Sequence, residues 1–533
     1  MQTEILVVGG GLGGVAAALA AARAGRQVVL SEAFDWLGGQ LTSQATPPDE
    51  HVWIEQFGAT RSYRALRDAT RDYYRDHFLL TGEMRGWAEM NPGCGWVSRL
   101  CAEPRVSLAV IEAMLAPWRS AGRITVLQPW KPVAAEVEGD RVRAVTLRHR
   151  DSGEERVIAA AYVLDATELG DLLPLTGTEY VTGFEAQSDT GEPSAPAQAQ
   201  PDNVQALSVC FAMDHVDGDH RIDRPESYDY WRQVQPAFWG APLLSLSGPH
   251  PRTLEVVERR FVPNPDGDPR LVDPDPRNHG NDPNLWTYRR IAARKAFREG
   301  AYASDITLVN WPMIDYMEGS IIDVSEAEAE RHLKRAAELS LCAFYWLQTE
   351  APRPDGGQGW HGLRLRGDVT GTDHGLAMAP YIREARRIRP VTRIVEQDLS
   401  LAARGDRGAV RYRDSVGIGM YRIDLHPSTG GDNYIDVGSC PFEIPLGALL
   451  PERMSNLLPA CKNIGSTHIT NGCYRLHPVE WNIGEVAGLL AAHCLGTGLT
   501  PHQVQAGDET LSTFQKHLEN EGIELRWPHV AAY

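Results

Sequence analysis

Two histidines and an arginine occupy one short stretch near the carboxyl end of the sequence. A neutral imidazole can accept a proton, and a guanidinium can bind a carboxylate or stabilise a developing negative charge. Pro478 suits the first turn of a helix, so His477 is expected at a helix N-terminus, where the dipole favours the neutral ring. We predict His477 as the catalytic base, His468 as the competing base and Arg475 as a binding residue. The alternative is that either histidine only hydrogen-bonds to backbone.

Glycines near the start of the chain predict a phosphate-binding turn. Val7 and Val8 lead into Gly9-Gly10-Gly11-Leu12-Gly13-Gly14, a G-x-G-x-x-G between an apolar run and an alanine-rich helix pattern. Such a turn lets the backbone approach a pyrophosphate, and the helix N-terminus supplies unpaired N–H groups. We expect Gly9 to make the tight turn, Gly11 the close approach and Gly14 the packing of helix on strand.

The elements that must position this turn follow directly. Residues 15–22 have helical propensity, and Gly25 is a natural C-terminal stop. A second strand over residues 27–30 ends at Glu32, whose carboxylate can accept both hydroxyls of a ribose. The βαβ unit with its acidic end residue predicts a dinucleotide site, with an unrelated glycine-rich turn as the alternative.

Three further segments carry a resemblance to a known superfamily. The first, residues 35–41, contains Gly38-Gly39-Gln40 just after the ribose-binding carboxylate. The second, residues 162–168, contains Ala166 and Thr167 as in a strand-plus-A-T-G motif, with Glu168 where glycine is common. The third runs from Asn456 past Asn463 and Arg475 to Gly484-Glu485-Val486-Ala487-Gly488. Together they resemble the glutathione-reductase-like FAD superfamily.

The resemblance implies FAD as cofactor and an α/β fold. That fold is a Rossmann-like FAD-binding domain with a β-meander insertion, assembled from discontinuous segments, plus a mixed α+β substrate domain. Residues 380–388 and 441–445 look like the branch described only as FAD-dependent oxidoreductases. The implied cofactor-binding residues are Gly9, Gly11, Leu12, Gly13, Gly14, Glu32, Gly38, Gly39, Gln40, Ala166, Thr167, Asn463, Gly484 and Glu485.

Patterning along the chain divides it into segments. We assign residues 1–46, 105–180 and 430–500 to the FAD-binding domain, 47–104 and 181–429 to the substrate domain, and 501–533 to a C-terminal extension. Helices are expected over 105–119 and 325–349, and short strands over 124–164. The stretches 187–203 and 263–283 look like loops because they are rich in proline and polar residues. The frequent tryptophans of the middle of the chain indicate core packing or stacking on a substrate ring.

Four arginines form a second polar group. Arg383, Arg386, Arg387 and Arg389 lie at helical spacing around Glu384. One face could bind an anionic substrate. Ion pairs with the carboxylates of the protein itself are the alternative.

Composition excludes several classes of protein. The 533 residues include 52 Lys and Arg against 70 Asp and Glu, a formal charge of −18, which disfavours nucleic acid and anionic membranes. No apolar run is long enough for a membrane span, and we expect a cytoplasmic protein. Eight cysteines without C-x-x-C indicate neither a metal site nor a disulfide scaffold. A second dinucleotide motif, as expected of an NAD(P)H domain, is missing.

These patterns favour one function over two others. The leading hypothesis is an FAD-dependent oxidoreductase that takes a hydride from a small organic substrate at an alcohol, amine or C–C bond, with reoxidation by O2 or an external acceptor. The alternatives are a flavin-dependent monooxygenase using NAD(P)H and O2, and a non-catalytic flavin-binding sensor or scaffold. The sequence leaves open the substrate, covalent attachment of FAD and the oligomeric state.

Overall fold

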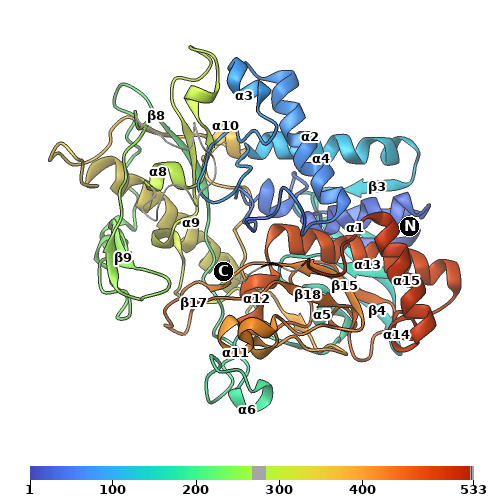
Figure 1. Cartoon of the computed structure of the whole chain (residues 1–533). Coiled ribbons are helices and arrows are strands. Elements are labelled where there is room, and N and C mark those ends of the chain that lie inside the picture. The colour runs from blue at the N-terminus through green and yellow to red at the C-terminus, as the bar shows by residue number, and fades with distance from the viewer. Residues whose placement is uncertain (267–283, 529, 531–533) are drawn as a thin grey trace.

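A 7-stranded sheet forms the centre of the nucleotide-binding half of the molecule (Figure 1). The computed structural model describes residues 1–266, 284–528 and 530. Five of the strands run parallel in the order β3 (Ile124–Leu127), β2 (Val28–Ser31), β1 (Gln2–Val8), β6 (Glu155–Asp165) and β19 (Leu457–Pro459). Apolar residues of β1 and β2 are buried because helices or loops cover both faces of the sheet. The predicted βαβ unit and α/β fold are therefore confirmed.

The remaining two strands form the expected β-meander. β4 (Trp130–Glu138) and β5 (Arg141–His149) pair antiparallel with each other, and β5 pairs with the first part of β6. The second part of β6 lies between β1 and β19. There, Asp165 of β6 pairs with Val8 of β1 on one side and with Pro459 of β19 on the other. One long strand thus connects the insertion to the parallel sheet.

Two helices from opposite ends of the sequence pack tightly together beside this sheet. They are α1 (Leu12–Arg23) and α13 (His477–Thr497), seen side by side in Figure 1. A Cβ atom on Gly484 would lie 2.0 Å from the Gly13 oxygen, and one on Gly488 would lie 2.3 Å from the Ala17 oxygen. Only residues without a side chain permit this approach of the two backbones.

The predicted helix over 105–119 is α4 (Pro104–Ser120), which also contacts α1.

A second, antiparallel sheet forms the other half of the molecule. Its order is β11 (Arg290–Ala292), β12 (Ile306–Val309), β8 (Phe211–His215) and β13 (Leu363–Leu365). The predicted long helix is α9 (Glu326–Thr349), with Ser325 as its N-cap. Trp231, Trp239, Trp286 and Trp311 belong to the hydrophobic core of this half, which supports the core-packing interpretation of these tryptophans.

The other helices and strands connect or cover these two sheets. They are α2 (Arg61–His77), α3 (Gly82–Gly86), α5 (Leu172–Thr176), β7 (Tyr180–Val181), α6 (Gln187–Thr190), α7 (Tyr228–Gln233), β9 (Ser247–Pro249), β10 (Val256–Glu258), α8 (Leu285–Tyr288), α10 (Gly367–Thr370), β14 (Arg387–Ile388), α11 (Leu401–Arg404), β15 (Ser415–Gly419), β16 (Ile423–Leu425), β17 (Ile435–Val437), β18 (Phe442–Pro445), α12 (His468–Tyr474), α14 (Pro501–Ala506) and α15 (Asp508–Glu521). The predicted loop over 187–203 thus begins with one short helix, and most of the predicted loop over 263–283 lies outside the described residues.

The helical spacing assigned to the four arginines is wrong. Arg387 lies in β14, which pairs with β7, and no helix covers residues 380–389. Three of the arginines form ion pairs, which favours the alternative interpretation over an anion-binding face: Arg383 with Asp315 at 3.0 Å, Arg386 with Asp323 at 2.8 Å, and Arg387 with Glu185 at 3.0 Å. Burial of a charge requires such a partner.

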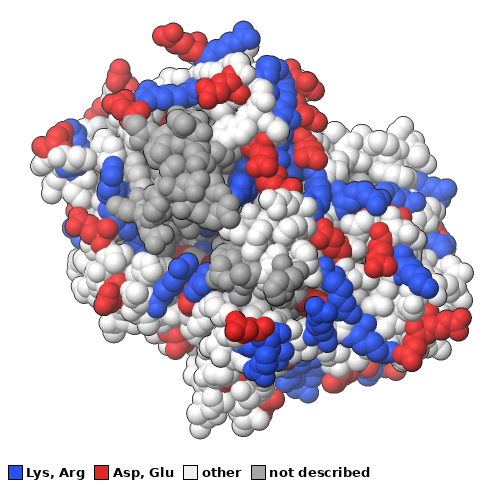
Figure 2. Space-filling model, viewed as in Figure 1, with Lys and Arg blue, Asp and Glu red and all other residues white. Residues whose placement is uncertain are grey.

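Charges of both signs are interspersed on the face that Figure 2 shows. Basic side chains therefore form no continuous track on this face of an acidic protein. Among the described residues, no helix combines the length and the apolar character that a membrane crossing needs.

Candidate functional site

The glycine turn lies at the carboxyl ends of β1 and β6. Gly9 has a φ of +101°, and a Cβ atom there would lie 2.2 Å from the Ala166 oxygen. A Cβ atom on Gly14 would lie 1.9 Å from the Gly9 oxygen. The turn and packing roles expected of these two glycines thus match the structure. Ala166 and Thr167 lie against the turn, with the Thr167 backbone nitrogen 2.6 Å from the same Gly9 Cβ position.

Glu32 lies next to the same turn, directly after β2. Its Oε2 accepts a hydrogen bond from the Gly10 nitrogen at 2.6 Å, and its Oε1 accepts one from the Phe34 nitrogen at 3.0 Å. Burial raises the pKa of Glu32 to about 7, although these backbone donors oppose the shift. The carboxylate therefore lies beside the glycine turn and is held by its backbone.

The second glycine pair closes over the first. The Gly38 nitrogen donates to the Gly10 oxygen at 2.7 Å, and a Cβ atom on Gly39 would lie 2.9 Å from the Gly11 Cα. Gln40 then links this loop to the start of α13, because its Nε2 donates to the Arg475 oxygen at 3.1 Å. The two predicted loops and the segment before α13 form one continuous site.

Three of the predicted cofactor residues contact neighbouring elements of the protein. The Asn463 side chain donates to the Asp165 oxygen at 3.0 Å, and Gly484 packs against the Gly13 backbone. Glu485 pairs with Arg23 at 2.6 Å and accepts a hydrogen bond from Ser62 at 2.6 Å. Their contacts fix the strand and helices around the turn.

Arg475 and His477 lie together in a buried cluster at the N-terminus of α13. The Asp49 nitrogen donates to His477 Nδ1 at 3.1 Å, and burial lowers the pKa of this histidine to about 4. Arg475 donates to the Tyr381 hydroxyl at 3.3 Å and to the Asp424 oxygen at 3.0 Å. Because Nδ1 accepts a hydrogen bond, the neutral ring carries its proton on Nε2.

Arg289 extends this cluster from the other half of the molecule. It directly precedes β11, and its Nη1 lies 3.5 Å from Asp49 Oδ1. Three nearby tyrosines also raise the pKa of this guanidinium: Tyr288, Tyr381 and Tyr421. The cluster therefore lies between the nucleotide-binding sheet and the antiparallel sheet.

Several buried polar atoms of this region have no hydrogen-bond partner within the described part of the chain. They are Arg289 Nε, Arg475 Nε, His477 Nε2 and Gln44 Oε1. Leaving a buried polar group unpaired costs about 1–3 kcal/mol, so these atoms are available to a ligand or to a bound water. Most of these atoms are donors, which suits a ligand with acceptor oxygens.

His468 lies in a different environment. Its Nδ1 pairs with Glu384 at 2.9 Å, and its ring stacks on Phe184 with centroids 3.6 Å apart. Although burial opposes the shift, His468 and Arg387 lower the pKa of Glu384 to about 2. The structure thus places His468 in an ion-pair network, apart from the contacts of Arg475 and His477.

Sequence reasoning missed Asp49, Arg289, Tyr381 and Gln44. Asp49, Gln44 and Tyr381 lie in irregular segments, and Arg289 lies in the turn before β11. Tyr381 belongs to residues 380–388, which carry the family resemblance, but that resemblance gave it no role at the site. One local signal was available, because Gln44 lies only a few residues after the predicted Gly38-Gly39-Gln40 loop. The other three depend on how distant segments pack.

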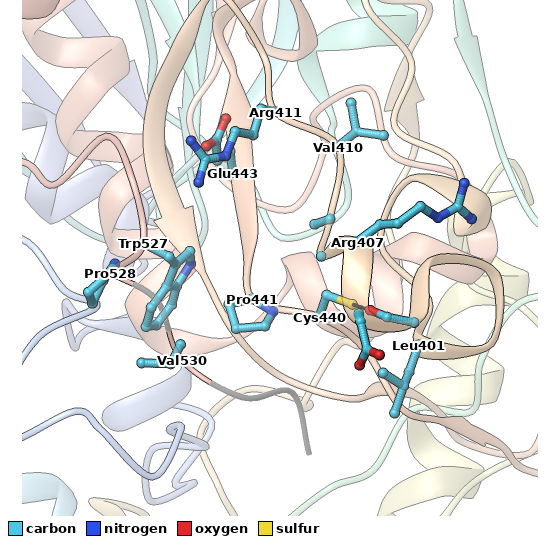
Figure 3. Close-up of a pocket in the computed structure, with 14 residues that line it drawn as sticks. Leu401, Arg407, Val410, Arg411, Cys440, Pro441, Glu443, Trp527, Pro528 and Val530 are labelled. Atoms are coloured by element: carbon cyan, nitrogen blue, oxygen red, sulfur yellow. Dashed lines mark hydrogen bonds between the residues drawn. The ribbon is translucent and has the colours of Figure 1, made fainter.

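Figure 3 shows a separate pocket of about 610 Å³ between residues 405–411 and the segment that contains Trp527. Trp527 Nε1 donates to the Gly419 oxygen at 3.1 Å and to the Phe442 oxygen at 2.9 Å. None of the predicted site residues lines this pocket.

Comparisons with known proteins agree with the site. Residues 4–518 match the family described as FAD dependent oxidoreductase, and the chain belongs to that family. Its cofactor is accordingly FAD, and it is an FAD-dependent oxidoreductase, which confirms the resemblance seen in the sequence. No curated protein matches the chain.

Solved structures give only distant likenesses. The flavin-dependent brominase Bmp2 is 12% identical with a TM-score of 0.25, over 42% of this chain and 48% of that one. L-proline dehydrogenase from P. horikoshii is 16% identical with a TM-score of 0.17, over 35% and 25%. Glycerol-3-phosphate dehydrogenase from Bacillus halodurans, complexed with FAD, is 15% identical with a TM-score of 0.22, over 40% and 40%. Each alignment spans less than half of the matched structure.

FAD fits the residues that the structure brings together. The glycine turn leaves space that a Cβ atom would fill, and the N-terminus of α1 suits a pyrophosphate. At the other end, the unpaired donors of Arg475 and His477 suit the oxygens of a flavin or of a substrate. The carboxylates of Glu480 and Glu168, which lie beside the N-terminus of α1, do not suit a pyrophosphate.

Proposed function

We propose that the protein oxidises a small organic substrate, an alcohol, an amine or a C–C bond, by hydride transfer to FAD. The buried cluster at the N-terminus of α13 carries this proposal, because it offers unpaired donors from Arg289, Arg475 and His477 beside the carboxylate of Asp49. Oxygen or an external acceptor would reoxidise the cofactor. When bound, FAD supplies the hydride acceptor.

His477 serves in this proposal as a hydrogen-bond donor. Both ring nitrogens are committed in the neutral form, since Nδ1 accepts from the Asp49 nitrogen and Nε2 carries the proton. A low pKa keeps the ring neutral at physiological pH. Nε2–H can therefore orient a substrate oxygen but cannot remove its proton, which replaces the role of base that the sequence suggested.

Asp49 is the proton acceptor that this arrangement offers. With an alcohol or an amine, Asp49 would accept the O–H or N–H proton while the substrate carbon gives up a hydride, and a C=O or C=N bond would form. With a C–C bond, Asp49 would accept a proton from the carbon next to the one that gives up the hydride, and a C=C bond would form. Arg289 and Arg475 lie on the same cluster and stabilise negative charge that develops on the substrate oxygen. Burial of the cluster excludes water and strengthens these interactions.

Anaerobic mixing of the holoenzyme with representative alcohols, amines and amino acids tests the proposal. We expect one class to bleach the absorbance of oxidised FAD without any nicotinamide cofactor. Absence of bleaching by every class would contradict substrate oxidation, and rapid bleaching by NADPH alone would favour the monooxygenase alternative. Measuring FAD released by heat confirms in the same sample that the cofactor was present.

A further inference from the structure

The anion-binding end of α1 already contacts a protein carboxylate. Glu480 is fully buried in the first turn of α13, and its Oε1 accepts a hydrogen bond from the Gly13 nitrogen at 3.2 Å. Its other oxygen accepts a hydrogen bond from Gln40. A helix N-terminus favours one negative group at this position, whether a side chain or a phosphate.

A second carboxylate lies on the open side of the same turn. Glu168 Oε1 is buried without a partner within the described residues, 2.9 Å from the Cβ position of Gly11 and 3.0 Å from that of Gly39. Glu168 replaces the glycine that the A-T-G motif commonly has. Both carboxylates therefore face the space that the glycines leave for the pyrophosphate.

The charges around Glu480 do not balance a further anion. The titratable groups beside it include Lys462, Glu168 and the Cys461 thiol, and one side-chain atom each of Glu168, Cys461 and Glu480 lie within 4.8 Å of one another. The Lys462 ammonium pairs with Glu168 and lies 3.5 Å from Cys461 Sγ. One cation thus faces two carboxylates, and burial raises the pKa of Glu480.

The pyrophosphate of FAD adds two negative charges beside this set. Like charges at short range in a buried site repel strongly, since the effective dielectric constant is far below that of water. Protonation removes the charge of Glu480 and leaves its hydrogen bond with Gln40 possible. Glu480 lies in the first turn of α13, and the backbone of this helix is held against α1 at Gly484.

We propose that Glu480 holds the N-terminus of α1 in the FAD-free protein, and that FAD binding neutralises it by taking one proton from solvent. The structure assigns Glu480 a positioning role toward the cofactor, which does not depend on the substrate. The proposal rests on FAD binding at the glycine turn, not on substrate oxidation.

Calorimetric titration of FAD into the FAD-free full chain tests the proton uptake. Titrations at pH 8 in two buffers of different ionisation enthalpy give the number of protons taken up per FAD. We expect net proton uptake by the wild type, at most one proton per FAD, and close to none in Glu480→Gln. The wild-type Kd should rise with pH, toward about tenfold per pH unit, the limit for one proton; the Kd of the variant should stay flat.

Glu192→Gln is the matched control. Glu192 is also a buried carboxyl group with a raised pKa, but it contacts Thr467 and the Glu396 nitrogen and not the glycine turn. Persistence of the uptake in this variant shows that the loss in Glu480→Gln is not a general effect of removing a buried carboxyl group. No uptake by the wild type, or equal uptake by Glu480→Gln, would overturn the proposal, and the wild-type result holds even where the variant does not fold.

Discussion

Burial determines how each polar residue of the active site can act. His477 is neutral because its pKa falls to about 4, and its Nδ1 is occupied by the Asp49 nitrogen. Arg475 is held by Tyr381 and by the Asp424 oxygen, which leaves its Nε free within the described residues. Residue type alone suggested a base and an anion-binding group. In the function that we propose, the hydrogen bond from the Asp49 nitrogen makes His477 a donor and not the base.

Replacing Asp49 tests the assignment of the proton acceptor. Asp49→Asn retains the size of the side chain but cannot accept the substrate proton, so we expect kcat to fall by roughly 10²–10⁴-fold. FAD content, measured by absorbance, should stay the same, because Asp49 contacts neither the glycine turn nor Glu32. Asp424→Asn removes a partly exposed carboxylate 4.0 Å from Arg475 and serves as the control, with a small effect. Equal losses in both variants would contradict a specific role of Asp49.

At the scale of elements, the α1–α13 contact joins the two ends of the sequence. The glycine turn precedes α1, and the buried cluster with Arg475 and His477 lies at the N-terminus of α13, so this contact sets the distance between the turn and the cluster. Small residues at Gly13, Ala17, Gly484 and Gly488 allow the close approach. In the sequence, Gly484 and Gly488 belonged to a segment that resembles the FAD superfamily. The sequence did not indicate that these glycines contact another helix, because that requires the partner.

Gly484→Ala tests this contact. The added methyl group would lie 2.0 Å from the Gly13 oxygen, so the helices must separate. Overpacking of this kind costs about 1–3 kcal/mol of the free energy of unfolding, and FAD affinity should fall with it. Denaturant unfolding and FAD titration measure the two effects. Gly82→Ala is the control, since nothing lies within 4 Å of its Cβ position; a similar loss there would indicate a general effect of alanine.

At the scale of the whole molecule, local motifs predicted the nucleotide-binding half better than the rest. The glycine turn, Glu32 and the strand pattern of the meander each depend on neighbours in sequence, and all appear in the structure. Arg289 and Asp49 come from segments that are far apart in the sequence, and no local pattern predicts their contact. The arginines of residues 383–389 show the converse failure. Their helical spacing was local, but long-range ion pairs and strand pairing determined the conformation.

Buried carboxyl groups also tie the stability of the whole molecule to pH. Glu192 is fully buried, accepts hydrogen bonds from Thr467 at 2.6 Å and from the Glu396 nitrogen at 2.8 Å, and has a pKa raised by burial to about 7. The folded state therefore keeps this proton over a pH range in which the unfolded state has lost it. Stability falls as pH rises from about 4.5 to about 7, and the loss persists above that range.

Glu192→Gln resembles the protonated carboxyl group and should remove this loss. At pH 8 we expect the variant to exceed the wild type by up to about 3 kcal/mol in the free energy of unfolding, and at pH 5 by little or nothing. Glu32 and Asp165 act in the same direction as Glu192, while His51 and His477 act in the opposite direction. Both proteins share these groups, so the difference between their denaturation curves isolates Glu192. The exposed Glu299→Gln is the control, and a gain for Glu192→Gln that is the same at both pH values would contradict the linkage.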